Sequence, residues 1–311
     1  MTSVSTPQTS DVGATGTDHT TDRAERIERI RRAAYRIRRN ALDMGEVQGQ
    51  GYIGQALGVA DVLAVVYTDQ LRYRPEDPHW PDRDRFLLSI GHYAIALYAA
   101  LAEAGTIPVE ELETYGSDDS RLPMSAMASY TPGVEISGGS LGHGLPVATG
   151  MALGLRHQGN SARVVNLLSD GELDEGSTWE AALACAHHGL DNVTAIVDVN
   201  ALQADGPTAG VLRTEPVTEK WQAFGWHALR VDGNDVAALV DALDELRAHR
   251  GSPAVLICDT RIGSGVPLLE TREKAHFMSV AEQEWQIARD QLAEGHTAGH
   301  TAGSTTEGQT R

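Results

Sequence analysis

Two continuous apolar runs, residues 163–170 and 192–200, restrict the fold more than any other feature of the sequence. Neither run (RVVNLLSD and NVTAIVDVN) alternates apolar with polar residues, so each predicts a parallel strand that is covered on both faces. The segment between them, STWEAALACAHHGL, has helical spacing, and Ser177 with Glu180 predicts a capping box at its start. Together the three segments predict a strand–helix–strand unit.

The same alternation continues on both sides of this unit. Apolar residues recur at helical spacing from Ile30 to Met44, and a second helix is predicted over residues 59–71. Further apolar runs lie at residues 85–92, 226–232 and 253–260, and further helical patterns at 93–105 and 236–250. The pattern predicts an α/β fold, with one doubly wound parallel sheet and helices on both faces.

The two ends of the chain differ in composition from its centre. Residues 1–22 and 295–311 are rich in Ser, Thr and Gly, so we predict a disordered tail at each end. Residues 23–294 form the single predicted domain, with its last helix at 281–293. The N-terminal stretch has neither a basic start nor an apolar segment, and it is therefore not predicted to be a signal peptide.

Charge and cysteine content narrow the choice of partners and compartment. A net charge of −18 argues against nucleic acid and anionic membranes as partners, because both attract clustered cations. Residues 23–39 are an exception with eight arginines, which form either a solvated helix face or a contact surface for an acidic partner protein. Cys185 and Cys258 lie in buried patterns and are expected to be free thiols in a reducing, cytoplasmic compartment. No apolar run approaches the roughly 20 residues of a membrane helix.

Asp170 and Asn200 are the last residues of two neighbouring predicted strands. Ligands of such sheets bind beyond the carboxyl ends of the strands, so we expect the two side chains to converge there. Carboxylate and amide oxygens suit Mg²⁺ or Ca²⁺. Gly171 permits a close backbone approach, and a helix that begins just after it would direct free N–H groups at a phosphate. The sequence thus predicts a metal–diphosphate site, the alternative being an ordinary Asp-Gly turn.

This arrangement resembles the signature of thiamine diphosphate enzymes, Gly-Asp-Gly followed about 30 residues later by Asn, with Ser169 in place of the first Gly. Four ordered blocks resemble the N-terminal segment of transketolases: RFLLSIGH, TPGVEISGGSLGHGLPVATGMALG, the stretch from SDGELDEG to NALQADGPT, and AFGWHALRVDGND. The chain is identified on these blocks as a member of that family, and the segment is the diphosphate-binding domain of the cofactor site.

The resemblance implies a role for each matching residue. Asp170 and Asn200 become Mg²⁺ ligands through their side chains and Leu202 through its carbonyl, with Ca²⁺ able to replace Mg²⁺. The N–H of Gly171 and the rings of His92 and His276 would bind the diphosphate. The loop that lies along the aminopyrimidine and thiazolium rings contributes Gly139, Ser140 and Leu141. The two histidines and Glu175, which matches a carboxylate that reaches across the subunit interface, are the implied catalytic residues.

Half of the cofactor site is missing from the sequence. Thiamine catalysis requires a carboxylate at N1′ of the aminopyrimidine, and transketolases carry it in a following pyrimidine-binding domain. The chain ends before such a domain, so the expected partner is a C-terminal transketolase subunit, in an α₂β₂ heterotetramer.

The part of the site that binds the sugar departs from the family pattern. Tyr52, Asn234 and either Ser125 or Ala126 stand where transketolases carry histidines. We therefore expect a changed donor, a ketose or a 2-oxoacid, with an aldehyde as acceptor. The alternatives are a subunit of a 2-oxoacid decarboxylase or dehydrogenase complex, and a non-catalytic scaffold subunit.

Overall fold

Five parallel strands form the central sheet of the computed structural model, which describes residues 19–272 and 275–304. Their spatial order is β2 (Arg85–Leu88), β3 (Val164–Ser169), β4 (Val193–Val199), β8 (Ala254–Asp259) and β7 (His227–Asp232). Because every neighbouring pair is parallel, all carboxyl ends lie at one edge of the sheet. The predicted α/β fold is confirmed.

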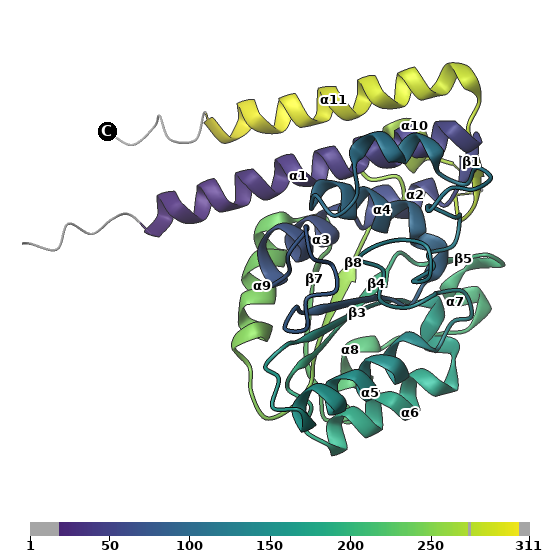
Figure 1. The fold of residues 1–311 in the computed structure, drawn as a ribbon. Helices are drawn as coiled ribbons and strands as arrows, with labels where there is room; N and C mark the ends of the chain where they lie inside the picture. Colours follow the sequence, from purple (N-terminus) through teal and green to yellow (C-terminus); the bar gives the residue numbers. More distant parts are fainter. Residues whose placement is uncertain (1–18, 273–274, 305–311) are drawn as a thin grey trace, which may run out of the picture.

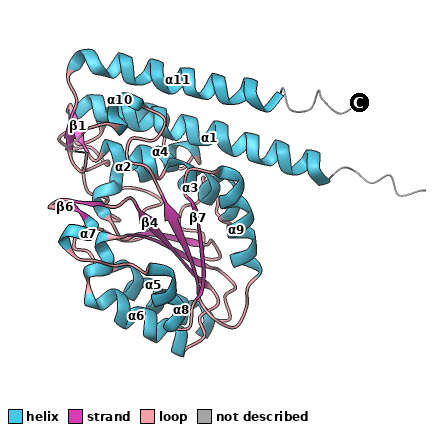
Figure 2. Cartoon of the chain, turned by 180° about the vertical axis from the view of Figure 1, so that it is seen from behind, coloured by secondary structure: helices cyan, strands magenta, loops and turns pink. Residues whose placement is uncertain are grey.

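Helices cover both faces of the sheet (Figure 1). One face carries α1 (His19–Gln48), α2 (Ile53–Gly58), α3 (Ala60–Val65), α4 (Ala94–Glu103) and α9 (Val236–Ala248). The other carries α5 (Gly144–His157), α6 (Gly176–His187) and α8 (Val217–Ala223). Outside α1 lie α10 (Pro267–Glu270) and α11 (Glu282–Ser304), as Figure 2 shows from behind. Within the described residues, no helix is both long and apolar enough to cross a membrane.

Short elements complete the fold, mostly near the carboxyl edge of the sheet. Two antiparallel pairs are β1 (Gln50–Gly51) with β9 (Met278–Ser279), and β5 (Leu202–Gln203) with β6 (Gly206–Pro207). The remaining turns are η1 (Val66–Gln70), η2 (Gly91–Tyr93), η3 (Val109–Thr114), η4 (Gly171–Asp174) and α7 (Thr208–Val211).

Alternate residues of each strand enter two separate cores. In β3, Val165 and Leu167 pack into the core under α1–α4, whereas Val164 and Leu168 pack into the core under α5 and α6. Successive side chains of a strand point to opposite faces, so a strand buried on both faces must be apolar throughout. This explains the continuous apolar runs that predicted the sheet.

The helix boundaries differ from the predicted ones at both ends. The first helix begins at His19, inside the predicted tail 1–22, and α11 continues to Ser304, well past the predicted boundary at residue 294. The His296 ring stacks on Tyr35 of α1 with ring centroids 4.2 Å apart, a contact that composition alone does not reveal. Residues 1–18 and 305–311, also predicted to be disordered, lie outside the described residues.

The helix predicted over residues 59–71 forms α3 and the turn η1, and a break at Val59 separates it from the unpredicted helix α2 at Ile53–Gly58. The break follows Gly58, where an added Cβ would lie 2.9 Å from the carbonyl oxygen of Arg261. The chain therefore bends where the backbone must pass close to the loop after β8.

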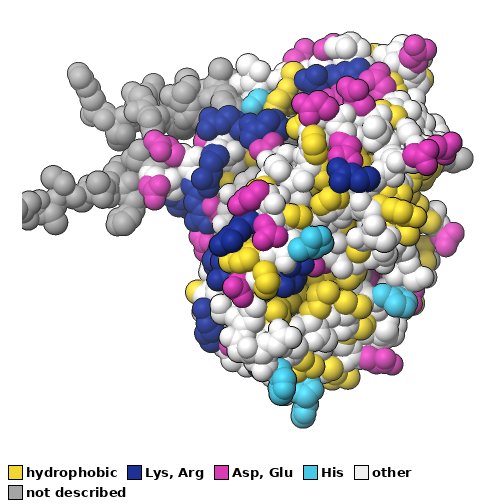
Figure 3. Space-filling model, viewed as in Figure 1, with side chains coloured by type: hydrophobic (Ala, Val, Ile, Leu, Met, Phe, Trp, Pro, Cys, Tyr) yellow, Lys and Arg dark blue, Asp and Glu magenta, His cyan; other side chains and the backbone are white. Residues whose placement is uncertain are grey.

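The arginines of α1 form a largely solvated helix face, as one of the two interpretations predicted, since all but Arg26 and Arg38 of the eight are exposed. Several of them also form ion pairs within the chain. Ion pairs join Arg23 to Asp241, Arg26 to Asp69 and Asp244, Arg36 to Glu103, and Arg38 to Asp61. They fasten α1 to α9, η1, α4 and α3, and the Arg38–Asp61 pair is buried. In Figure 3 this side of the molecule shows cationic and anionic side chains interleaved.

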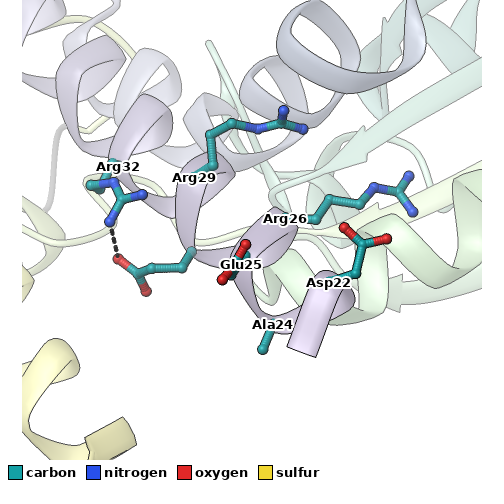
Figure 4. A pocket seen from close by; sticks show the side chains of 7 residues that line it. Asp22, Ala24, Glu25, Arg26, Arg29 and Arg32 are labelled. Atoms are coloured by element: carbon teal, nitrogen blue, oxygen red, sulfur yellow. Dashed lines mark ion pairs between the residues drawn. The ribbon is translucent and has the colours of Figure 1, made fainter. Parts of the chain in front are cut away.

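A hollow of about 760 Å³ lies beside the first turns of α1 (Figure 4). Its walls belong to this one helix and include Arg26, Arg29 and the Glu28–Arg32 ion pair. Figure 1 places this end of α1 opposite to β5 and α7, so the hollow is not the predicted site.

Candidate active site

Asp170 lies at the carboxyl end of β3 with its carboxylate almost completely buried. Oδ1 accepts a hydrogen bond from the N–H of Gly171 at 2.9 Å, and Oδ2 accepts from the N–H of Ala201 and the hydroxyl of Thr208, both at 2.9 Å. Burial, and then the charge of Asp198, raise its pKa to about 6. A carboxylate whose ionised form is disfavoured in this way gains from a nearby cation.

Asn200 follows β4, and its amide is held in one orientation. Nδ2 donates to Oδ2 of Asp198 at 2.7 Å and to the hydroxyl oxygen of Tyr93 at 2.8 Å. Asp198 is itself fixed by the Tyr93 hydroxyl at 2.7 Å and by the hydroxyl of Thr260. Since Oδ1 accepts one bond, from the N–H of Leu202 at 3.1 Å, the amide oxygen keeps a lone pair for a cation.

The donor atoms fit the predicted metal. A carboxylate oxygen, an amide oxygen and the Leu202 carbonyl are hard ligands, which suit Mg²⁺ or Ca²⁺ and not a thiolate-seeking metal. Among residues 19–272 and 275–304, no three His, Cys, Asp or Glu side chains group as a metal cage. A site with one carboxylate therefore suits Mg²⁺, which completes its shell with phosphate oxygens and water.

His92 and His276 come together across the edge of the fold, with ring centroids 5.8 Å apart. Tyr52 lies against both, at 4.6 Å from His92 and 5.4 Å from His276. Burial, and then His276, lower the pKa of His92 to about 4, and burial also lowers the pKa of His276. Both pKa values lie below the ordinary value, so the rings are neutral at pH 7, and His92 can offer one N–H to a phosphate oxygen. The ring of His276 is also hydrogen-bonded to the backbone of Leu202, which opposes the lowering of its pKa.

Gln55 of α2 supports this cluster and was not singled out from the sequence, where it lies in an ordinary helical pattern. Its Nε2 donates to the carbonyl oxygen of His276 at 2.6 Å and lies 3.2 Å from Nδ1 of the same residue. Its Oε1 is buried without a hydrogen-bond partner among the described residues. Gln55 thus fixes the backbone that carries His276.

The glycine-rich loop that begins at Gly138 packs directly on the turn that carries His92. A Cβ added to Gly91 would lie 2.4 Å from the carbonyl carbon of Gly138, so neither position tolerates a side chain. Ser125 donates to the Gly138 carbonyl at 3.2 Å, and the N–H of Ala126 donates to the Gly91 carbonyl at 3.2 Å. The next residues of the loop follow this contact: Gly139 and Ser140 are exposed and Leu141 is partly buried.

Glu172 is the clearest residue that sequence reasoning missed. It follows Asp170 and Gly171, a position typical of an acid in an early helix turn, but its side chain is fully buried and accepts hydrogen bonds from the Ser89 hydroxyl and from the N–H of Gly142 at 2.8 Å. Burial raises its pKa to about 7. Glu172 therefore joins the ends of β2 and β3 to the glycine-rich loop.

The predicted helix directly after Gly171 is also wrong. Residues Gly171–Asp174 form the single turn η4, and α6 begins at Gly176. Ser177 does not cap α6, because its hydroxyl donates to the Gly142 carbonyl at 2.7 Å. Glu175 is exposed at the start of α6, and its predicted role at a subunit interface stays a prediction.

The three positions that depart from the family histidines have different surroundings. Tyr52 and Ser125 adjoin the cofactor-side residues described above. Asn234 instead donates to the Gly58 carbonyl at 2.8 Å and to Asp61 at 3.1 Å, and accepts from the N–H of Arg261. Asn234 therefore links α2 and α3 to the loop after β8. Tyr52 and Ser125 are the better candidates for donor contacts.

Residues 30–298 match the family model described as transketolase, thiamine diphosphate binding domain. The chain belongs to the transketolase family. A transketolase family protein of Sinorhizobium fredii is 64% identical over 266 residues, which cover 85% of this chain and 95% of that protein. An apulose-4-phosphate transketolase subunit of Actinobacillus succinogenes is 40% identical over 242 residues, covering 78% of this chain and 87% of the relative.

Solved structures agree with this assignment. Transketolase from Campylobacter jejuni aligns with a TM-score of 0.78 at 29% identity, covering 86% of this chain and 43% of that chain. The enzyme from Leishmania mexicana gives a TM-score of 0.77 at 29% identity, covering 89% and 46%. The chain thus spans less than half the length of these enzymes. The predicted family and enzyme class, a thiamine diphosphate-dependent transferase of the transketolase type, are confirmed.

Proposed function

We propose that the chain is the N-terminal subunit of a two-component transketolase-like enzyme. It binds Mg²⁺ and the diphosphate of thiamine diphosphate, and a second subunit supplies the pyrimidine-binding domain. The observation that carries the proposal lies at the carboxyl edge of the sheet, where the Asp170 carboxylate accepts a hydrogen bond from the N–H of Ala201, the residue that follows Asn200. Relatives named as transketolase subunits support a split enzyme, since the chain covers 87% and 93% of two of them. The two subunits would assemble as an α₂β₂ heterotetramer, and the two buried free cysteines fit a reducing, cytoplasmic compartment.

Each part of the site has a role in this proposal. Asp170, Asn200 and the Leu202 carbonyl hold the metal. The N–H of Gly171 and the neutral rings of His92 and His276 bind the diphosphate. The loop residues Gly139, Ser140 and Leu141 lie along the cofactor rings, and Glu175 contacts the neighbouring subunit. Thiamine diphosphate supplies the nucleophilic carbon when bound, while the chain orients the cofactor and excludes water.

The reaction proposed is transfer of a ketol or acyl unit from a ketose or 2-oxoacid donor to an aldehyde acceptor. Tyr52 in place of a histidine, packed on His92 and His276, supports a donor other than the usual ketose phosphates. The names of two relatives specify apulose 4-phosphate and 6-deoxy-6-sulfo-D-fructose, so subunits of this kind serve varied sugars. The alternatives, a 2-oxoacid dehydrogenase subunit or a scaffold, gain no support from relatives named transketolase subunits.

The test is reconstitution with the partner chain. Equimolar subunits with Mg²⁺ and thiamine diphosphate are assayed with xylulose 5-phosphate, hydroxypyruvate and pyruvate as donors and an aldehyde acceptor. We expect activity only with both chains, and its loss in Asp170→Ala. The control Asp118→Ala removes an exposed carboxylate that forms no part of the proposed metal or diphosphate site, and it should keep full activity. Undiminished activity of Asp170→Ala would overturn the site assignment.

A further inference from the structure

A second cavity lies at the amino edge of the sheet, at the opposite ends of the strands from Asp170 and Asn200. Its volume is about 550 Å³, and it is lined by four arginines: Arg156, Arg163, Arg247 and Arg250. Arg163 directly precedes β3, Arg250 precedes β8, and the other two come from the last turns of α5 and α9. Such a gathering of cations is unexpected in a chain with a net charge of −18.

Most of this positive charge lacks an anionic partner. Among the described residues, the only ion pair of the four arginines is that of Arg156 with Asp191 at 3.2 Å. The others are held by neutral groups: Arg163 donates to the Thr194 hydroxyl at 3.0 Å, and Arg247 to the carbonyl of Gln70 at 3.0 Å.

Arg250 is also held by neutral groups, since it donates to the carbonyls of Arg247 and His249 at 2.6 and 2.7 Å. The guanidinium groups of Arg163, Arg247 and Arg250 are thus held by neutral acceptors and form no ion pair among the described residues. Fixed donors bind an anion with little loss of side-chain entropy.

The charges repel one another in the absence of a ligand. Arg163 is partly buried, and its pKa is lowered by burial and by Arg247 and Arg250, with Asp84 opposing. The acidic groups beside the cluster are Asp84, Asp191 and, next to Arg247, Asp244, and among the described residues only Asp191 forms an ion pair with it. Four arginines thus face three carboxylates, and positive charge remains in excess. A bound dianion would remove this repulsion.

We propose that this cavity binds a small phosphate-bearing molecule. Arginine binds phosphate oxygens with paired, charge-assisted hydrogen bonds, and a phosphate monoester near neutral pH carries up to two negative charges that would offset the excess positive charge of the cluster. The volume lies in the range of small-molecule sites. The ligand would sit apart from the cofactor, because the two sites lie at opposite ends of the strands. This site is independent of the proposed reaction.

The test is a calorimetric titration of the full chain with inorganic phosphate at pH 7.5, in metal-free buffer without cofactor. We expect saturable binding by the wild type and by Asp170→Ala, whose cofactor site is impaired. Arg250→Gln and Arg163→Gln should weaken binding about tenfold each, the effect of losing a hydrogen bond to a charged group. The control Arg39→Gln removes an exposed arginine of α1 and should leave the affinity unchanged.

Thermal melts establish that each variant is folded. If Arg163→Gln is unfolded, Arg163→Lys, which keeps the charge, takes its place. The phosphate affinity of Arg163→Lys should lie between those of the wild type and Arg250→Gln. Equal affinity in Arg250→Gln and Arg39→Gln would overturn the proposal. So would loss of binding in Asp170→Ala, which would place the phosphate at the cofactor site, or the absence of saturable binding by the wild type.

Discussion

Replacing Glu172 by Gln should stabilise the chain at alkaline pH and have little effect at acid pH. Glutamine keeps an oxygen that can accept the hydrogen bonds from Ser89 and Gly142, but it carries no charge. The buried carboxyl has its pKa raised from 4.5 to about 7, so between these values the folded state holds a proton that the unfolded state has released. The stability that this proton contributes is complete below pH 4.5 and is lost as the pH rises through 7.

The size of the effect follows from the two pKa values. The raised pKa changes the free energy of unfolding by about 3 kcal/mol in total, at roughly 1.4 kcal/mol per unit of pKa shift. About 2 kcal/mol of this change falls between pH 5.5 and 8.5. The difference in free energy of unfolding between Glu172→Gln and wild type should therefore grow by about 2 kcal/mol over this interval. Urea titrations followed by tryptophan fluorescence at four pH values measure it directly.

The exposed Glu180 on α6 offers a matched control. Glu180→Gln also removes one carboxylate, but a surface substitution of this kind changes stability by less than about 0.5 kcal/mol. A Glu172→Gln difference that stays constant from pH 5.5 to 8.5 would refute the reasoning, because it would show that Glu172 is not protonated at the lower pH.

Three further outcomes follow from the site and the fold. Both oxygens of Asp198 accept hydrogen bonds, from Asn200 and Tyr93 on one side and from Thr260 on the other, and Asp198→Asn replaces one of them with a donor. This should disturb the orientation of the Asn200 amide and lower the Mg²⁺ affinity of the assembled, cofactor-bound enzyme about 10-fold or more, measured by metal titration; an unchanged affinity would contradict the orienting role. Tyr52→His should raise kcat/KM for xylulose 5-phosphate relative to wild type, since acid–base help from a histidine is worth about 10²–10⁴-fold; no gain would place Tyr52 outside the donor site. Truncation after residue 294 removes the His296–Tyr35 stack and should destabilise the chain by about 1 kcal/mol in urea titrations, whereas no loss would show that the stack is weak.

The sheet was predictable because its strands are buried on both faces. Continuous apolar runs such as 164–169 and 193–199 are typical of strands covered on both sides, and both are strands. Helix boundaries were less predictable, since they depend on distant contacts. The break after Gly58 follows from the backbone of Arg261, and the length of α11 from its packing along α1. No local pattern encodes either contact.

The predicted site residues divide in a similar way. Asp170, Asn200 and the paired histidines follow strand ends or matched motifs, and the structure brings them to one edge of the sheet. Glu172 was not singled out, because an acid after Asp-Gly resembles an ordinary helix start. Its burial depends on Ser89 and Gly142, which lie 83 and 30 residues away in sequence. Gln55 was not identified from the sequence either, because its partner His276 is also distant in sequence.

The exchange of the C2 proton of thiamine diphosphate tests the central claim, a cofactor site shared by two chains. NMR follows the replacement of this proton by deuterium with the chain alone, with its partner alone, and with both. Fast exchange requires the activating carboxylate at N1′, which we assign to the partner. The account predicts fast exchange only in the mixture, and its loss when the chain carries Asp170→Ala. Fast exchange by this chain alone would contradict it, because the chain would then carry its own activating group.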